Sequence, residues 1–322
     1  MKSSEILEAK AAIWHQQIAG LLSLAQELGQ PQPDLAPYYA KLKDLFMVEG
    51  PLAALQDDAD IVVRAEGPAV VNKPPLADVN WLFANVQTQF KGLVAAAFAT
   101  KTADAMSLAS KVPIVLTGIA PGSFYAGFKL DTSDDGFNAP LLGAESHEEA
   151  IQSARGALEN LVVVPGFVLD TAIDEEIYEV IPDPAMRDAS LMAAYHLSPT
   201  GQRGIHTLEF SSPNADAKSA ELDTRDRVVL RETVVKKPVL RAAKRGKFVG
   251  VMRGVDLDKT RVMLRDVDGI GSLRCAIQMN TDMARALLGK RVLVSGMYEE
   301  NRHGKPAMLN VEQIEPVPEL DL

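Results

Sequence analysis

Residues 246–278 read GKFVGVMRGVDLDKTRVMLRDVDGIGSLRCAIQ, and this stretch decides how the C-terminal part of the chain folds. Apolar and polar residues alternate over Phe248–Val255, Arg261–Arg265 and Ser272–Gln278, which is the period-two pattern of half-buried strands. Short segments with turn-forming residues separate the three runs. The pattern therefore predicts three consecutive strands.

The residues that follow complete a recognisable order of elements. Asn280 or Thr281 caps a short predicted helix that ends at Gly289. Alternation then predicts two more strands, over Arg291–Tyr298 and Ala307–Glu315. The order is three strands, one helix and two strands.

This order over residues 246–316 resembles the OB-fold, a small Greek-key barrel. The segment KRVLVSGMY at 290–298 and the segment Gly304–Ile314 are similar to the last two strands of such barrels, and the resemblance covers about a fifth of the chain. It rests on pattern, and an SH3-like barrel has a similar order. The resemblance implies a domain that binds single-stranded nucleic acid or oligosaccharide across its second and third strands. We recognise no family for residues 1–220.

Basic side chains around these strands are the candidate nucleic-acid contacts. Alternation points Arg261, Arg265 and Arg274 away from the barrel interior. A basic lead-in precedes the first strand, at the mouth of the barrel. The predicted set is Lys244, Arg245, Lys247, Arg253, Arg261, Arg265 and Arg274.

Arg253 belongs to this set only under one condition. Alternation in the first strand predicts that Val249, Val251 and Val255 face inward, and Arg253 shares their register. Arg253 points outward only if Gly250 or Gly254 marks a β-bulge.

Aromatic residues are scarce in the predicted barrel. Only Phe248 and Tyr298 occur between residues 246 and 316, so a platform for base stacking is missing. Contacts would be made to phosphates and would be sensitive to salt. Many such barrels bind protein or pack only against their own chain, and this alternative stays open.

Charge is distributed unevenly along the chain. Residues 221–322 hold 19 Lys and Arg against 15 Asp and Glu, whereas residues 1–220 hold 14 against 28. Within Arg225–Arg265 the count is 13 basic to 4 acidic residues. Such asymmetry is typical of a segment that binds a polyanion. It also fits a basic segment that docks on an acidic partner or on the acidic part of its own chain.

Length and composition limit the class of protein. The 322 residues, of which 47% are hydrophobic and 24% charged, predict two or three globular domains. No run of 18 apolar residues occurs, so we expect no membrane-spanning helix, and charges in the first thirty residues argue against a signal peptide. The single cysteine excludes an intrachain disulfide and a Cys-rich metal site, and the expected compartment is the cytoplasm.

The remaining patterns predict an α+β chain with N-terminal helices, a mixed middle domain and the C-terminal barrel. Helical spacing over residues 4–28 and 36–48 predicts a hairpin that dimerises, holds a protein partner or packs on its own domain. The predicted parts are a helical segment over 1–60, an α+β domain over 61–211, a linker with a basic stretch over 212–245, the barrel over 246–316 and a tail over 317–322.

Motifs for catalysis are weak. The chain has no Walker A sequence, no dinucleotide fingerprint and no nucleophile elbow, and we expect no cofactor and no metal. Carboxylates and histidines in the middle domain, around Asp131, His147, Glu148 and His206, leave a metal-dependent hydrolase or nuclease as an alternative.

The sequence therefore predicts a non-catalytic binding or regulatory protein. Its barrel contacts nucleic acid or an acidic surface, and its N-terminal part mediates protein interaction. A pure interaction scaffold without nucleic-acid binding is the second alternative.

Overall fold

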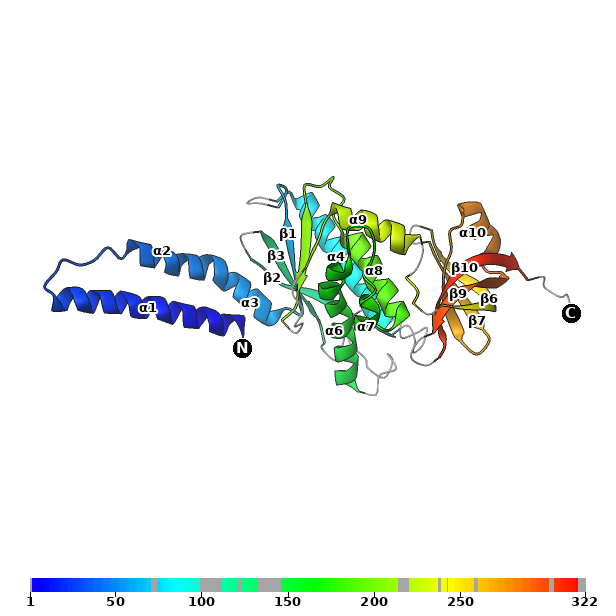
Figure 1. Cartoon of the computed structure of the whole chain (residues 1–322), viewed down its shortest axis with the longest axis horizontal. Helices are drawn as coiled ribbons and strands as arrows, with labels where there is room; N and C mark the ends of the chain where they lie inside the picture. The colour runs from blue at the N-terminus through cyan, green and yellow to red at the C-terminus, as the bar shows by residue number, and fades with distance from the viewer. Residues whose placement is uncertain are drawn as a thin grey trace.

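The computed structural model describes residues 2–70, 74–98, 112–120, 123–132, 146–213, 220–236, 239–241, 243–257, 260–300 and 304–317. The chain forms a helical hairpin, then a middle domain built on a five-stranded sheet, then a closed five-stranded barrel. The hairpin projects from one side of the middle domain and the barrel lies on the other (Figure 1). The predicted α+β class is confirmed. No helix within the described ranges has the length and apolar character needed to cross a bilayer.

The N-terminal hairpin packs one long helix against two short ones. Helix α1 (Ser3–Glu27) runs beside α2 (Ala36–Asp44) and α3 (Gly50–Asp58), and a π-helical turn at Leu45–Glu49 joins the short helices. Apolar residues at three- and four-residue spacing make a small core of its own between them. That core consists of Leu7, Ala11, Ile18, Leu35, Leu42, Leu45 and Ala53.

An antiparallel sheet forms the centre of the middle domain, with strand order β2-β3-β1-β4-β5. The strands are β1 (Ile61–Glu66), β2 (Ile114–Ala120), β3 (Phe124–Leu130), β4 (Thr207–Ser211) and β5 (Glu221–Leu222). Along β1, Ile61, Val63 and Ala65 are fully buried on the face that the helices cover. Val62 and Arg64 point to the opposite face, as the period of two requires.

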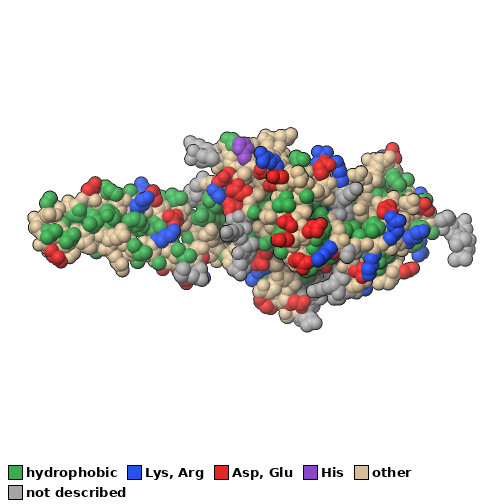
Figure 2. Space-filling model, viewed as in Figure 1, with side chains coloured by type: hydrophobic (Ala, Val, Ile, Leu, Met, Phe, Trp, Pro, Cys, Tyr) green, Lys and Arg blue, Asp and Glu red, His purple; other side chains and the backbone are tan. Residues whose placement is uncertain are grey.

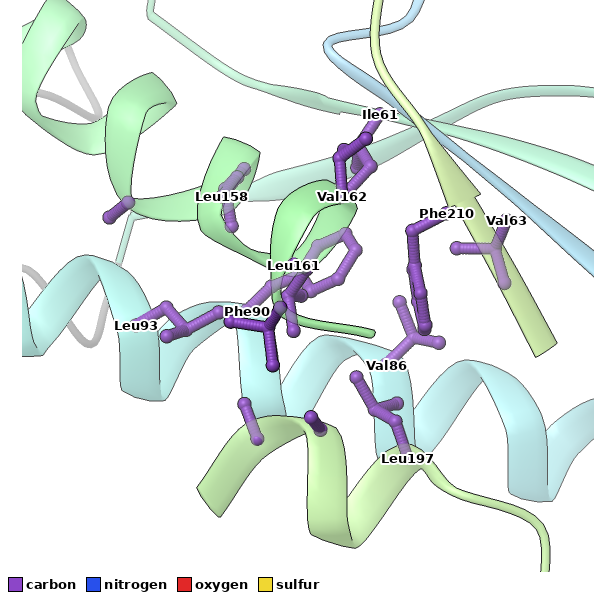
Figure 3. Packing of buried hydrophobic residues seen from close by; sticks show 14 of the residues in the cluster. Ile61, Val63, Val86, Phe90, Leu93, Leu158, Leu161, Val162, Leu197 and Phe210 are labelled. Atoms are coloured by element: carbon purple, nitrogen blue, oxygen red, sulfur yellow. The ribbon is translucent and has the colours of Figure 1, made fainter. Parts of the chain in front are cut away.

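Three helices cover one face of this sheet. They are α4 (Leu76–Phe98), α6 (His147–Val163) and α8 (Pro184–Leu197). Phe90 of α4 and Phe210 of β4 lie at the centre of the core between helices and sheet (Figure 3). The Asp183 carboxylate accepts hydrogen bonds from two backbone N–H groups of α8, which fixes where this helix begins.

Residues 220–236 do not form the linker that the sequence predicts. Strand β5 pairs with β4 at the edge of the sheet, and α9 (Thr224–Leu230) packs against α8. Leu222, Leu230 and Val234 are fully buried in the core of the middle domain. Apolar residues spaced through a polar segment are enough to anchor it, because each removes surface from water when it is covered.

The barrel closes through five strands in the order β10-β8-β7-β6-β9. The elements are β6 (Lys244–Asp256), β7 (Arg261–Val267), β8 (Gly271–Ala276), α10 (Thr281–Leu287), β9 (Arg291–Glu300) and β10 (Pro306–Pro316). Strand β10 pairs in parallel with β8 and antiparallel with β9, which also pairs with β6. The prediction of a small closed β-barrel is confirmed, and its strand order is consistent with an OB-like barrel.

The register predicted for the first barrel strand is wrong in part. Phe248 and Met252 face the barrel core, and Val249 and Val251 lie on the outer side. The ladder between β6 and β7 shifts between Met252 and Gly254, so Arg253 is the extra residue of a β-bulge. The bulge restores Val255 to the inner face and leaves Arg253 exposed.

The single cysteine is part of the barrel core. Cys275 is 1% exposed among apolar side chains, and burial raises the pKa of its thiol far above the usual value. The thiol therefore stays protonated.

Closure of the barrel depends on a glycine in β9. A Cβ atom on Gly296 would lie 2.0 Å from the carbonyl oxygen of Asn310 on β10. The close approach of β9 and β10 is therefore possible only because residue 296 has no side chain. We expect Gly296→Ala to lower the free energy of unfolding by about 1–3 kcal/mol, as overpacking does. Urea denaturation followed by circular dichroism measures this loss.

Gly254→Ala is the matched control. Its Cβ would meet Met263 at 3.6 Å, an ordinary contact, and the position lies in β6 of the same barrel. Equal stabilities of the two variants would contradict the role given to Gly296.

Candidate nucleic-acid interface on the barrel

The two basic residues at the start of β6 are exposed and paired with carboxylates of the barrel itself. Lys244 Nζ donates to Glu300 at 2.7 Å, and Arg245 Nη2 donates to Glu312 at 3.1 Å. The hydrogen bond to Glu300 raises the pKa of Lys244. Each charge is thus partly neutralised before any ligand arrives.

Arg261 points away from the barrel, as predicted, but it meets helix α8 of the middle domain. Its Nη2 and Nε donate to the two carboxylate oxygens of Asp188, at 2.7 and 3.3 Å. The side chains are only 14% and 10% exposed. Arg261 also donates to the carbonyl of Val234 at 3.2 Å. It therefore belongs to the contact between the domains.

Arg274 lies beside Arg261 on the outer face of β8 and is half-buried at the same contact. Desolvation lowers the pKa of its guanidinium, while Asp188 and Asp183 act in the opposite direction. The part of the barrel surface that carries Arg261 and Arg274 thus faces the middle domain. Arg261 and Arg274 therefore contact the acidic part of their own chain, which is one of the alternatives that the charge distribution left open.

A second ion pair holds the same two domains together. Arg187, which precedes Asp188 on α8, is 1% exposed, and its Nη2 donates to Glu299 of β9 at 2.6 Å. Its Nη1 donates to the carbonyl of Ile181 at 3.1 Å, and its guanidinium lies 4.5 Å from the ring centre of Tyr178. Adjacent residues of one helix thereby bind two different strands of the barrel.

The other three predicted residues remain on the open surface. Lys247, Arg253 and Arg265 are exposed. Arg265 lies opposite Val251 of β6, and Arg291 of β9 lies opposite Val251 on its other side. Since neighbouring strands are about 4.8 Å apart, the backbones at Arg265 and Arg291 are separated by about 10 Å.

We call Lys247, Arg253, Arg265 and Arg291 the basic stripe. All four are exposed on the outer face of β9, β6 and β7, and none forms an ion pair with a residue in the described ranges. Lys and Arg side chains are visible on the barrel in the space-filling view (Figure 2). The stripe can therefore approach a chain of phosphates without first breaking an ion pair.

Sequence reasoning missed Arg291 and the residues of the interdomain contact. Arg291 begins a predicted strand, but its place beside Arg265 depends on the pairing of β9 with β6. Arg187, Asp188 and Glu299 give no local signal, although two opposite charges at the start of an apolar helix could have drawn attention to α8.

The two aromatic rings of the barrel are packed against each other. Phe248 and Tyr298 make an edge-to-face pair with ring centres 5.4 Å apart, and both pack on the barrel core. They are therefore engaged within the barrel and do not form a stacking platform beside the basic stripe.

The structure brings the residues of the hydrolase alternative together only in part, since His147 lies near the end of β3 beside Asp131 whereas His206 lies at the start of β4. Glu209 of β4, a further carboxylate of this sheet, pairs with Arg64 at 2.9 Å, and Tyr125 of β3 lies opposite Arg64. Asp131 lies beyond the end of β3, six residues from Tyr125, or about 20 Å along the strand direction. His147 begins α6 and contacts the carbonyl of Thr132. His206 is exposed at the start of β4.

In the described part of the chain, no three His, Cys, Asp or Glu side chains converge as a metal site would require. Asp134 and Asp135, which the sequence places in a cluster with Asp131, lie outside the described residues.

No family model, curated protein or solved structure matches this chain.

The interdomain ion pair allows a first test. Glu299→Gln removes the charge that compensates buried Arg187, and loss of one partner of a buried pair is strongly destabilising. We expect the free energy of unfolding to fall by about 3 kcal/mol. Urea denaturation measures the change.

Glu300→Gln is the control, one residue along the same strand. Its partner Lys244 is exposed, so we expect little change in stability. If both variants lost the same stability, the buried pair would not be what holds the barrel in place.

Proposed function

We propose that this chain is a non-catalytic modular binding protein whose barrel contacts the phosphates of single-stranded nucleic acid. The observation that carries the proposal is the basic stripe, with four exposed cations on three adjacent strands. Phosphate contacts by Lys and Arg position a protein on nucleic acid without reading its sequence.

The strand order of the barrel supports this proposal. A meander of three strands, a helix and two further strands, with the third and fifth strands parallel, is the arrangement of OB-type barrels. Here α8 covers part of the face of β7 and β8. The proposed contact is therefore displaced toward β6 and β9, where the basic stripe lies.

Binding through the stripe has a definite dependence on salt. Four phosphate contacts to a single strand give a slope of about −2.8 for log K against log salt concentration. Affinity then falls about 50-fold between 50 and 200 mM salt. Without stacking rings beside the stripe, we expect little preference among base sequences.

The double variant Arg253→Gln/Arg265→Gln tests the stripe. Removing two of four cations should reduce the slope to about −1.4, and it should weaken binding about tenfold at 200 mM salt and more strongly at 50 mM salt. Fluorescence anisotropy of labelled single-stranded DNA and RNA measures both quantities. Arg261 is left intact because its replacement would also disturb the interdomain contact.

Lys41→Gln/Lys43→Gln is the matched control, since both lysines are exposed on α2 and the change in net charge is the same. The control should bind like the unaltered protein. Equal loss in both variants would mean that only net charge matters, and no salt-dependent binding by the unaltered chain would exclude the nucleic-acid proposal.

The N-terminal hairpin supports a second binding role, in protein association. Helix α1 and its C-cap residue carry large apolar side chains that the hairpin does not cover, with exposures between 41% and 60%: Ile6, Ile13, Leu24 and Leu28. At about 100° per residue these four fall within an arc of about 60°, roughly 110° from the buried face of the helix. Figure 2 shows apolar side chains along this hairpin.

A second apolar face on one helix is typical of a surface that another protein covers. Tyr39, Phe46 and Met47 add exposed apolar surface on the other arm, at 55%, 51% and 63%. We propose that the hairpin associates with a second copy of itself. Such a scaffold role needs no nucleic acid.

Light scattering after size exclusion tests self-association at about 50 μM protein. We expect an oligomer for the unaltered chain and a monomer for Ile13→Glu/Leu24→Glu, because charge would be buried without a partner. Ala12→Glu/Ala19→Glu adds the same charge at exposed positions outside the arc and should stay oligomeric. A monomeric unaltered chain would rule out self-association.

A further inference from the structure

A cavity of about 490 Å³ lies between the barrel and the middle domain. Its volume is within the range of sites that hold small organic molecules, and such sites occur preferentially between domains. One wall comes from α4 and α8, and the other comes from β6, β7, β8 and β10. Neither domain alone makes an enclosing site.

The side chains that line most of this cavity are apolar and deformable. Met192 comes from α8, while Met263 and Met308 come from the barrel. Leu93, Ala189 and Ala193 complete the surface on the helices. Methionine fills irregular space and makes favourable contacts with aromatic rings. This lining suits a flat apolar group inserted between the two domains.

Charged groups are gathered at one part of the lining. Arg261 and Arg274 reach it from adjacent strands, and Asp188 faces them from α8. Asp188 already accepts from Arg261 through both oxygens. Asp256 and Gln89 are the other residues of the lining with polar end groups.

Arg274 can receive an added anion. Its guanidinium lines the cavity together with Arg261, and desolvation lowers its pKa although Asp188 and Asp183 act to raise it. A guanidinium carries five N–H donors in a planar fork that matches a carboxylate, sulfonate or phosphate. An acidic group placed here would add both charge and hydrogen bonds.

Access to the cavity is open at α4. Gly92 lines it and is exposed, and a Cβ added at Gly92 would meet no atom within 4 Å. A ligand can therefore enter past this residue. A large side chain introduced at the same position has room to grow into the cavity.

We infer that this interdomain cavity is a binding site for a small molecule with a flat apolar body and one anionic group. The apolar body lies among the three methionines, and the anion lies against Arg274. This site is separate from the basic stripe, because none of the stripe residues lines the cavity.

The probe 1-anilinonaphthalene-8-sulfonate has this chemistry, and its fluorescence increases in apolar surroundings. Titration of the full chain should show one saturable site. Gly92→Phe should weaken binding at least tenfold, because the ring occupies the cavity. Gly156→Phe is the matched control and should bind normally: Gly156 is an exposed helical glycine on α6, also with no atom within 4 Å of an added Cβ.

A second variant tests the anionic subsite without filling space. Arg274→Gln should weaken binding of the sulfonate about tenfold and leave binding of the neutral analogue N-phenyl-1-naphthylamine unchanged. If circular dichroism shows that Gly92→Phe does not fold, the comparison of the two probes in Arg274→Gln still tests whether the ligand binds in this cavity. Equal loss for both probes would overturn the anionic role of Arg274.

Two other outcomes would overturn the inference as a whole. One is the absence of saturable binding by the unaltered chain up to 1 mM probe. The other is loss of sulfonate binding in Arg253→Gln/Arg265→Gln with normal binding in Gly92→Phe, which would place the probe on the basic stripe. Nucleic-acid binding is measured separately, so its failure leaves this test unaffected.

Discussion

Two consecutive residues of α8 hold the barrel against the middle domain. Arg187 binds Glu299 of β9, and Asp188 binds Arg261 of β7. Both pairs are largely removed from water, so breaking either one leaves a charge without compensation in a poorly solvated place. Because the two pairs involve different strands, they oppose both sliding and rotation of the barrel against the helix.

This contact decides which basic residues of the barrel are available. Arg261 and Arg265 are four residues apart on β7, on the same outer face. The first is used to dock the barrel, whereas the second remains exposed beside Val251 and Arg291. The excess of positive charge in the C-terminal part therefore has two uses. Part of it holds the chain's own acidic domain, and the remainder is the basic stripe.

Much of the fold could be predicted because its signals are local. Asp183 and the apolar spacing after it mark α8, and the order of barrel strands follows from alternation and turns. Strand β6 was harder, because Val249 and Val251 alternate as well as Phe248 and Met252, and either set could face inward. In the structure Phe248 and Met252 face inward, and Gly250 between them lies where a side chain would collide with Val267. No local pattern distinguishes these solutions.

The site could be predicted only in part, because its pairs join distant parts of the sequence. Arg261 and Asp188 are 73 residues apart, and sequence alone gives no reason to associate them. The same holds for β5, whose two residues pair only because β4 leaves an edge open. Alternation correctly places Arg261 and Arg274 outside the barrel, but what lies opposite that surface is a tertiary property.

The arrangement of the three parts has a consequence for how binding events can influence one another. The hairpin and the barrel lie on opposite sides of the middle domain (Figure 1), so a partner on one need not obstruct a ligand on the other. The cavity differs, because its walls come from both the barrel and the middle domain. A ligand held there contacts both sides and stabilises the docked arrangement relative to any separated one. Docking also engages Arg261, which keeps this cation away from the surface. A ligand in the cavity would therefore also favour the arrangement in which Arg261 is held against Asp188.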